Sequence, residues 1–298
     1  MCSWISTSLA LSVLALAACD SQPSTCEAPE GLSPRGINFQ GLAWNGIQVQ
    51  GMTFNGIEFQ GISMQGTTLV GVDGDEVVVG RDLGAQTSTG DWIHLRIDDA
   101  HAHPTRADIT YYVLSYEGRN VCGPGGRGLF VPGTWDDTGA HDANAELVTF
   151  SCTTGVVAKC VEWGYAPHEV GAAAHQACTR MARADYCGDG VAHTREGTAV
   201  DIFDQLGVMR PESDDAEGMR FEAGWGPDGA VCVHEPRYDV VAPDGSSLRP
   251  ACWDTLPECA DEASATDEGS LLFNRSRPQE LLACDPDSFR RKRPGRSK

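Results

Sequence analysis

Cys187 and His193 are the two residues whose types and spacing most directly suggest chemistry. A cysteine can act as a nucleophile when a histidine takes its proton and an acidic side chain orients the histidine. Asp189 or Asp185 would be the orienting residue, and a hydrolase is therefore one interpretation of this segment. The interpretation that we prefer is structural: Cys187 belongs to a disulfide, and Asp185 and Arg183 make local hydrogen bonds at a helix end.

Histidines suggest a second chemistry, that of a metal site. Two groups hold suitable residue types: His168, His175 and His193 around one predicted helix, and Asp98, Asp99, His101 and His103 nearer the N-terminus. Neither group has the spacing of a known zinc motif, because the sequence has no HExxH and no paired CxxC. We therefore predict no bound metal and no cofactor.

The element that must position Cys187 and His193 is an amphipathic helix predicted at about 169–186. Its apolar stripe recurs at helical spacing and consists of Val170, Ala174, Ala177, Met181 and Ala184. We expect this stripe to pack on a sheet. Cys178 and Cys187 would lie ~13 Å apart on opposite helix faces, so they are not expected to bond each other.

This helix also carries a family resemblance. The string HQACTRMARADYCGDG, with CVEWGY before it and FEAGWGPDGAVC after it, resembles the ADYC domain, which is named for the motif at 184–187. The likeness covers roughly residues 75–275. It implies a fold family and a place among bacterial lipoproteins, and it carries over no catalytic residue.

The N-terminus predicts export and lipid attachment. Residues 5–18 form an apolar run that suits a signal peptide, and Leu16-Ala17-Ala18-Cys19 resembles the lipobox of bacterial lipoproteins. Cys19 would be the lipidated first residue of the mature protein. The alternative is an ordinary signal peptide that is cut near Ala18.

The cysteine count predicts a disulfide framework. Of 12 cysteines, cleavage removes Cys2 and lipidation uses Cys19, which leaves an even number in an exported chain. The ten candidates are Cys26, Cys122, Cys152, Cys160, Cys178, Cys187, Cys232, Cys252, Cys259 and Cys284. Spacing alone leaves their pairing open.

A five-residue repeat follows the N-terminal segment. Glycine recurs at every fifth position from Gly36 to Gly71, with apolar, polar, apolar and amide residues between. The pattern resembles a pentapeptide-repeat β-solenoid, and we expect it to dock on the following domain or to be partly ordered. A spacer is the preferred role; the alternative is a ladder that binds a glycan or a partner strand: Gln40, Asn45, Gln50, Asn55, Gln60 and Gln65.

The rest of the chain has a β pattern. Strands are expected at 77–79, 92–97, 109–116, 129–131, 147–150, 156–163 and 198–203, with a hairpin at 221–234. The region 236–280 is predicted to be loop-rich with one short helix before Leu271. The fold class is thus mainly β (α+β), a short solenoid followed by a disulfide-stapled β domain with one packed helix. The predicted organisation is a signal peptide at 1–18, a lipidated tether at 19–35, the repeat at 36–74, the ADYC-like domain at 75–285 and a basic disordered tail at 286–298.

The net charge limits which partners the protein is expected to have. The formal net charge is −20, which argues against nucleic acid as a partner.

Three aromatic residues suggest a second kind of partner. Trp163, Tyr165 and Trp225 would suit the floor of a carbohydrate pocket, although core packing is the preferred interpretation.

We expect a lipoprotein of the bacterial cell envelope, on its periplasmic or surface side, that acts as a binding or structural module. Its partners would be the membrane, through the lipid, and an envelope glycan or protein. An envelope hydrolase is the alternative.

Overall fold

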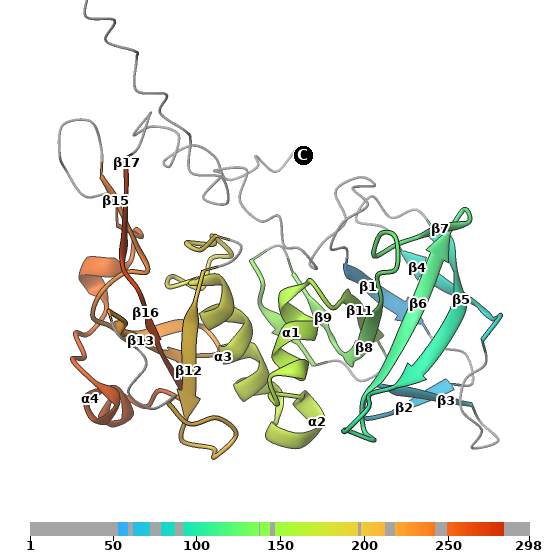
Figure 1. Cartoon of the computed structure of the whole chain (residues 1–298), viewed down its shortest axis with the longest axis horizontal. Helices are drawn as coiled ribbons and strands as arrows, with labels where there is room; N and C mark the ends of the chain where they lie inside the picture. Colours follow the sequence, from blue (N-terminus) through green and yellow to red (C-terminus); the bar gives the residue numbers. More distant parts are fainter. Residues whose placement is uncertain are drawn as a thin grey trace, which may run out of the picture.

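The computed structural model describes residues 53–58, 62–71, 79–86, 92–136, 138–143, 147–195, 198–211, 218–241 and 249–282. The fold is mainly β with few helices, as predicted. Figure 1 shows two β regions on either side of a helical layer. The segments predicted to be a signal peptide, a lipidated tether that begins at Cys19, and a basic tail lie outside the described residues.

The first β region is a seven-stranded sheet with the order β5-β4-β1-β11-β8-β6-β7. Its strands are β1 (Thr53–Glu58), β4 (Asp82–Gln86), β5 (Trp92–Ala102), β6 (Thr110–Tyr116), β7 (Arg119–Asn120), β8 (Gly128–Pro132) and β11 (Leu147–Cys152). β5 also pairs with β6, so the sheet curls back on itself. Among the described residues β6 meets β8 through one residue pair and β1 meets β4 through one, so the curled sheet is not a closed barrel.

The predicted central strand is β6, which has apolar side chains on both faces. Tyr112 and Leu114 face the core between the curled strands, where they pack with Phe130 and Phe150. Tyr111 belongs to a second apolar cluster, which joins the other face of the sheet to helix α1 (Val156–Glu162). The strands predicted at 92–97, 109–116, 129–131 and 147–150 are thus confirmed, while 77–79 falls mostly outside the described residues.

The described part of the glycine repeat forms strands of this domain. β1 continues through Gly56, with a bulge between Phe54 and Ile57, and pairs with β11, so the chain does not turn back at this glycine. A hairpin of β2 (Ile62–Gln65) and β3 (Thr68–Gly71) turns at Gly66 instead. Leu69 N–H donates to Tyr112 Oη at 2.8 Å, which fastens the hairpin to the sheet. A solenoid is therefore not confirmed: these repeats dock on the following domain, and 36–52 lies outside the described residues.

The helical layer differs from the prediction in two ways. The strand expected at 156–163 is wrong, because this segment is helix α1, with Val157, Ala158 and Val161 buried on one side. The helix expected at about 169–186 is split at Gly171, whose φ of +87° ends α2 (Pro167–Val170) before α3 (Ala172–Arg183) begins. The apolar stripe of α3 packs on the second sheet as predicted.

The second β region is a four-stranded antiparallel sheet with the order β12-β16-β13-β14. Its strands are β12 (Val200–Asp204), β13 (Arg220–Gly226), β14 (Gly229–Val233) and β16 (Leu272–Ser276). β13 and β14 are the predicted hairpin, and β12 confirms the strand expected at 198–203. The region 236–280 contains the predicted short helix, α4 (Glu262–Asp267), but β16 was not predicted and lies inside the sheet.

Smaller elements complete the fold. They are β9 (Thr134–Trp135) with β10 (His141–Asp142), and the parallel pair β15 (Tyr238–Val241) and β17 (Gln279–Leu282). None of the helices in the described ranges has the length and apolar character that crossing a membrane requires.

Candidate functional site

The ADYC motif begins where α3 ends. Ala184 adopts the left-handed conformation with φ of +50°, an uncommon choice for a residue with a Cβ. Asp185 N–H then donates to Arg180 O at 2.9 Å, which closes the helix end. The chain turns here and carries Asp185, Tyr186 and Cys187 into the interior between α3 and the second sheet.

Asp185 is the centre of a buried ion cluster. Its Oδ2 accepts from Arg180 Nη1 at 2.6 Å, from Arg183 Nη1 at 3.1 Å and from Gly190 N–H at 3.2 Å. Arg183 also donates to Gly190 O. Burial lowers the pKa of Arg183 to about 10, so this residue stays charged at neutral pH. The structural interpretation of Asp185 and Arg183 is confirmed: they hold the loop from 185 to 190 against the helix end.

Tyr186 reaches a second buried cluster, formed by Glu222 and Arg237. Tyr186 Oη donates to Glu222 Oε1 at 3.0 Å and accepts from Arg237 N–H at 2.9 Å. Arg237 pairs with both carboxylate oxygens of Glu222 at 3.0 Å, and neither side chain has any exposed surface. Burial lowers the pKa of Arg237, but Glu222 more than offsets this and leaves it above its ordinary value.

The remaining donors of Arg237 also have partners. Nη1 donates to Ala182 O and Thr194 Oγ1, and Nη2 donates to Met181 O. Asn274 of β16 donates to Glu222 Oε2 at 2.7 Å. This cluster therefore joins the end of α3, the second sheet and the 193–195 segment, with every charge used internally.

Sequence reasoning missed Glu222, Arg237 and Asn274. Glu222 stands between Phe221 and Ala223 in a strand pattern that would point it to the opposite face. The β13–β16 ladder shifts register at this point, so Glu222 is an extra residue whose carboxylate turns towards Arg237. The one sequence feature that could have indicated this cluster is a single acidic residue, Glu222, in an otherwise apolar hairpin.

Cys187 is part of a disulfide with Cys252, with an S–S distance of 2.04 Å. The structure pairs eight of the ten candidate cysteines; the other three pairs are Cys122–Cys152, Cys160–Cys178 and Cys232–Cys259. Cys178 and Cys187 therefore bond different partners, as their helix positions predicted. A nucleophilic role for Cys187 would require reduction of its disulfide. Cys26 and Cys284 lie outside the described residues.

His193 lies beside the motif but is not joined to the other proposed catalytic groups. Its ring centroid is 5.7 Å from that of Tyr186, and its N–H donates to Arg183 O. Burial lowers the pKa of His193 to about 4, so it is neutral at pH 7. Among the described residues no hydrogen bond links the His193 ring to Cys187, Asp185 or Asp189; Asp189 instead accepts from Val191 N–H.

His175 is fully buried in α3. Its Nδ1–H donates to Tyr165 O at 2.7 Å, and its Nε2 has no partner among the described residues. Burial lowers its pKa to about 3, so the ring is neutral at physiological pH. Among the described residues, the His, Cys, Asp and Glu side chains that come together closely enough to hold a metal ion include neither His175 nor His193.

The Asp98, Asp99, His101 and His103 group does not form one site. His101 Nδ1 lies 3.5 Å from Asp99 Oδ2 on the exposed face of β5, but His103 Nδ1 accepts from Thr105 and Arg106 N–H in the next turn. Core packing is confirmed for the candidate aromatic floor at Tyr165 and Trp225, which are fully buried, and Trp163 is half-buried.

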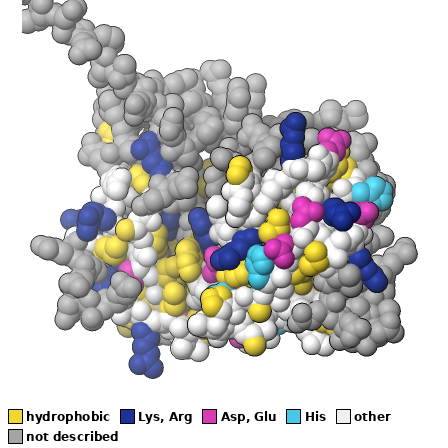
Figure 2. All heavy atoms as spheres, turned by 45° about the vertical axis from the view of Figure 1, so that its right-hand side comes forward, with side chains coloured by type: hydrophobic (Ala, Val, Ile, Leu, Met, Phe, Trp, Pro, Cys, Tyr) yellow, Lys and Arg dark blue, Asp and Glu magenta, His cyan; other side chains and the backbone are white. Residues whose placement is uncertain are grey.

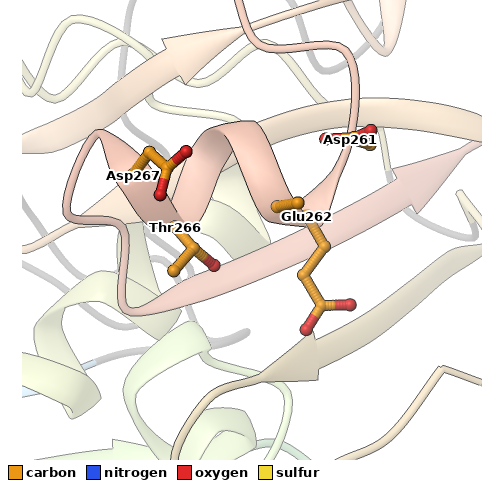
Figure 3. Close-up of a pocket in the computed structure, with 5 residues that line it drawn as sticks. Asp261, Glu262, Thr266 and Asp267 are labelled. Carbon is orange, nitrogen blue, oxygen red and sulfur yellow. The ribbon is translucent and has the colours of Figure 1, made fainter.

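A shallow depression beside α4 was also not predicted. It is lined by Asp261, Glu262, Ala263, Thr266 and Asp267. Figure 3 shows Asp261, Glu262, Thr266 and Asp267 spread around the short helix. Asp261 Oδ1 accepts from Ser264 N–H at 2.9 Å as the cap of α4. The acidic side chains of the depression do not converge on a common point, as the picture shows.

These features define the class of protein. Four disulfides in a mainly β fold are typical of an oxidising, extracytoplasmic compartment. The family model described as ADYC domain matches residues 74–239, more than half of the chain. The chain therefore belongs to the ADYC domain family. No curated protein and no solved structure matched in the corresponding comparisons.

Gly188 provides a test of how tightly the motif loop packs. It has φ of +63°, and a Cβ there would lie 1.7 Å from Asp228 O in the β13–β14 turn. We expect Gly188→Ala to lower the free energy of unfolding by roughly 2 kcal/mol or more, since it adds a clash to left-handed strain. Gly207→Ala is the matched control: its φ is +79°, but nothing lies within 4 Å of the added Cβ. Urea unfolding with the disulfides intact measures both, and equal losses would contradict the packing argument.

Proposed function

We propose that this chain is an exported lipoprotein whose ADYC domain is displayed on the cell envelope as a binding or structural module. Cys19 is the proposed lipid site, and an envelope glycan or protein is the proposed class of partner. The extracytoplasmic compartment that the disulfides indicate is consistent with this proposal.

The observation that carries the proposal is the use of the motif residues inside the fold. Asp185 holds Arg180 and Arg183, Tyr186 joins Glu222 to Arg237, and Cys187 bonds Cys252. Each motif side chain with a chemically active group thus has a structural partner. Such a motif favours a rigid scaffold, whose exposed loops present the binding surface.

The alternative remains an envelope hydrolase that uses Cys187 with His193, or a histidine-bound metal. The neutral ring of His193 is in the protonation state that a general base needs at pH 7. The thiol form of this hypothesis requires that the Cys187–Cys252 disulfide opens in the working protein. His193→Ala should abolish turnover in a hydrolase and leave a binding module able to bind.

Membrane fractionation tests the anchor. Wild-type protein is expected in the membrane fraction of an expressing bacterium, and Cys19→Ala is expected in the soluble fraction, because it removes the residue that would carry the acyl chains. Cys26→Ala is the matched control and should stay with the membrane. Retention in the membrane of a Cys19→Ala chain whose signal peptide has been removed would contradict lipidation at this site.

The thiol content distinguishes the module from the thiol hydrolase. We would unfold the mature Cys19→Ala chain and alkylate it without reductant before measuring its intact mass. The structure leaves only Cys26 and Cys284 unassigned, so we expect no label, or two labels that map to these residues. A label on Cys187 or Cys252 would show a free thiol there and would make the thiol hydrolase the preferred function.

A further inference from the structure

Asp108, His168 and Glu169 bring three metal-ligand types together on the surface. One ligand atom from each residue lies within 4.8 Å of the others. Asp108 comes just before β6, whereas His168 and Glu169 belong to α2. Figure 2, which turns the β5–β6 side forward, shows acidic, basic and histidine side chains side by side on this face.

The donor set defines the class of ion. Two carboxylates and one imidazole suit zinc and related divalent transition metals, while calcium and magnesium prefer oxygen ligands alone. Three protein ligands would leave at least one position for water. All three side chains are partly exposed, so an ion can reach them from solvent.

The surrounding backbone fixes Asp108 in place. Its carbonyl accepts from Thr67 N–H at 3.0 Å, and Thr110 N–H donates to Thr67 Oγ1 at 2.7 Å. The β2–β3 turn lies directly against both residues, since a Cβ on Gly66 would lie 2.3 Å from Asp108 O and 3.3 Å from His168 Nε2. His168 Nε2 also lies within hydrogen-bond distance of Asp108 Oδ2, at 2.8 Å, so the loop before β6, α2 and this contact together hold the ligand atoms at short range.

Arg106 already supplies positive charge at this place. Its Nη2 lies 2.6 Å from Glu169 Oε2 and 3.0 Å from Asp108 Oδ2, and its Nη1 donates to Val161 O at 3.0 Å. Both carboxylates thus face one cation. A divalent ion has twice that charge, and the −20 charge of the chain concentrates cations near its surface. Arg106 can release the carboxylates and keep its bond to Val161.

We propose that Asp108, His168 and Glu169 bind a zinc-class divalent metal ion that displaces the Arg106 guanidinium and links the loop before β6 to α2. This site is independent of the proposed function, because neither the lipid anchor nor the ADYC motif takes part. It differs from the expectation, drawn from the sequence, that the chain binds no metal.

Titration of the tag-free mature Cys19→Ala chain with Zn²⁺ tests the proposal by calorimetry. We expect one saturable site, tighter for Zn²⁺ than for Mn²⁺. His168→Ala and Glu169→Gln should each weaken Zn²⁺ binding at least ~10-fold. Arg106→Gln should strengthen it, since the competing cation is gone. His101→Ala is the matched control, because this histidine also lies next to an acid but on exposed β5.

The outcomes are decisive in either direction. Loss of binding in His168→Ala and Glu169→Gln, with His101→Ala unchanged, supports the site. Absence of saturable binding, or equal weakening by His101→Ala, overturns it. Circular dichroism and Tm of each metal-free variant show whether it is folded, and Glu169→Gln remains informative if His168→Ala is not.

Discussion

Replacing Glu222 with glutamine is expected to lower the free energy of unfolding by about 3–5 kcal/mol. The substitution keeps the size of the side chain and removes its charge. Arg237 would then be a fully buried cation without its counter-ion. Because Tyr186 and Asn274 also bond this carboxylate, the loss would extend from α3 to β16.

The measurement is urea unfolding at pH 7 with all disulfides intact. Glu235→Gln is the matched control, because Glu235 pairs with Arg220 at 2.8 Å on the surface, where Arg220 is 65% exposed. That pair should contribute less than about 1 kcal/mol. The double variant Glu222→Gln with Arg237→Met should recover part of the loss, since it removes the unpaired charge as well. A loss in Glu222→Gln no larger than that of the control would contradict a role for this ion pair.

Acidification is expected to destabilise the protein between pH 6.5 and pH 4.5, before most carboxylates are protonated. The pKa of His175 falls from 6.5 to about 3 on burial, and that of His193 to about 4. The unfolded chain therefore binds protons first as the pH falls, so the stabilisation is complete above pH 6.5 and is lost progressively below it. His175 alone should account for about 2–3 kcal/mol over these two pH units. His193 is only half-buried, so its contribution is smaller.

His175→Asn isolates this effect. The asparagine amide can replace Nδ1–H as the donor to Tyr165 O but does not titrate. Its lower stability at pH 7 does not matter, because the pH slope of the unfolding free energy is compared. The slope should flatten in His175→Asn and remain unchanged in His94→Asn, an exposed histidine of β5. Equal slopes in His175→Asn and wild type would count against the burial argument.

Much of the fold could be predicted wherever apolar residues mark the buried side or sides of an element. The strands at 92–97, 109–116 and 147–150 and the stripe of α3 follow from such patterns. The prediction failed at 156–163, where the β-branched valines suggested a strand. Val157, Ala158 and Val161 form one side of a short helix there, and Cys160 joins it to Cys178.

For the candidate site, the buried polar residues determine how much could be predicted from the sequence. Asp185 and Arg183 could be interpreted from their place at a helix end, because that contact is local. Glu222 and Arg237 are 15 residues apart and meet only through a bulge in β13. β16 was missed for a related reason: Asn274 and Ser276 are buried polar residues that interrupt its apolar pattern. Such positions depend on tertiary partners that a single sequence does not reveal.

The disulfide connectivity has a consequence for maturation of the chain. Cys122–Cys152 and Cys160–Cys178 each join cysteines that follow one another in the sequence, so each pair can form in the order in which its cysteines enter the oxidising compartment. The next four cysteines form two interlaced disulfides. Cys187 bonds Cys252, and Cys232, which lies between them in the sequence, bonds the later Cys259. Oxidation in order of appearance would join Cys187 to Cys232, a wrong bond that thiol–disulfide exchange must then correct. Among the four described disulfides, we therefore expect those of the second half of the domain to need disulfide exchange more than those of the first half.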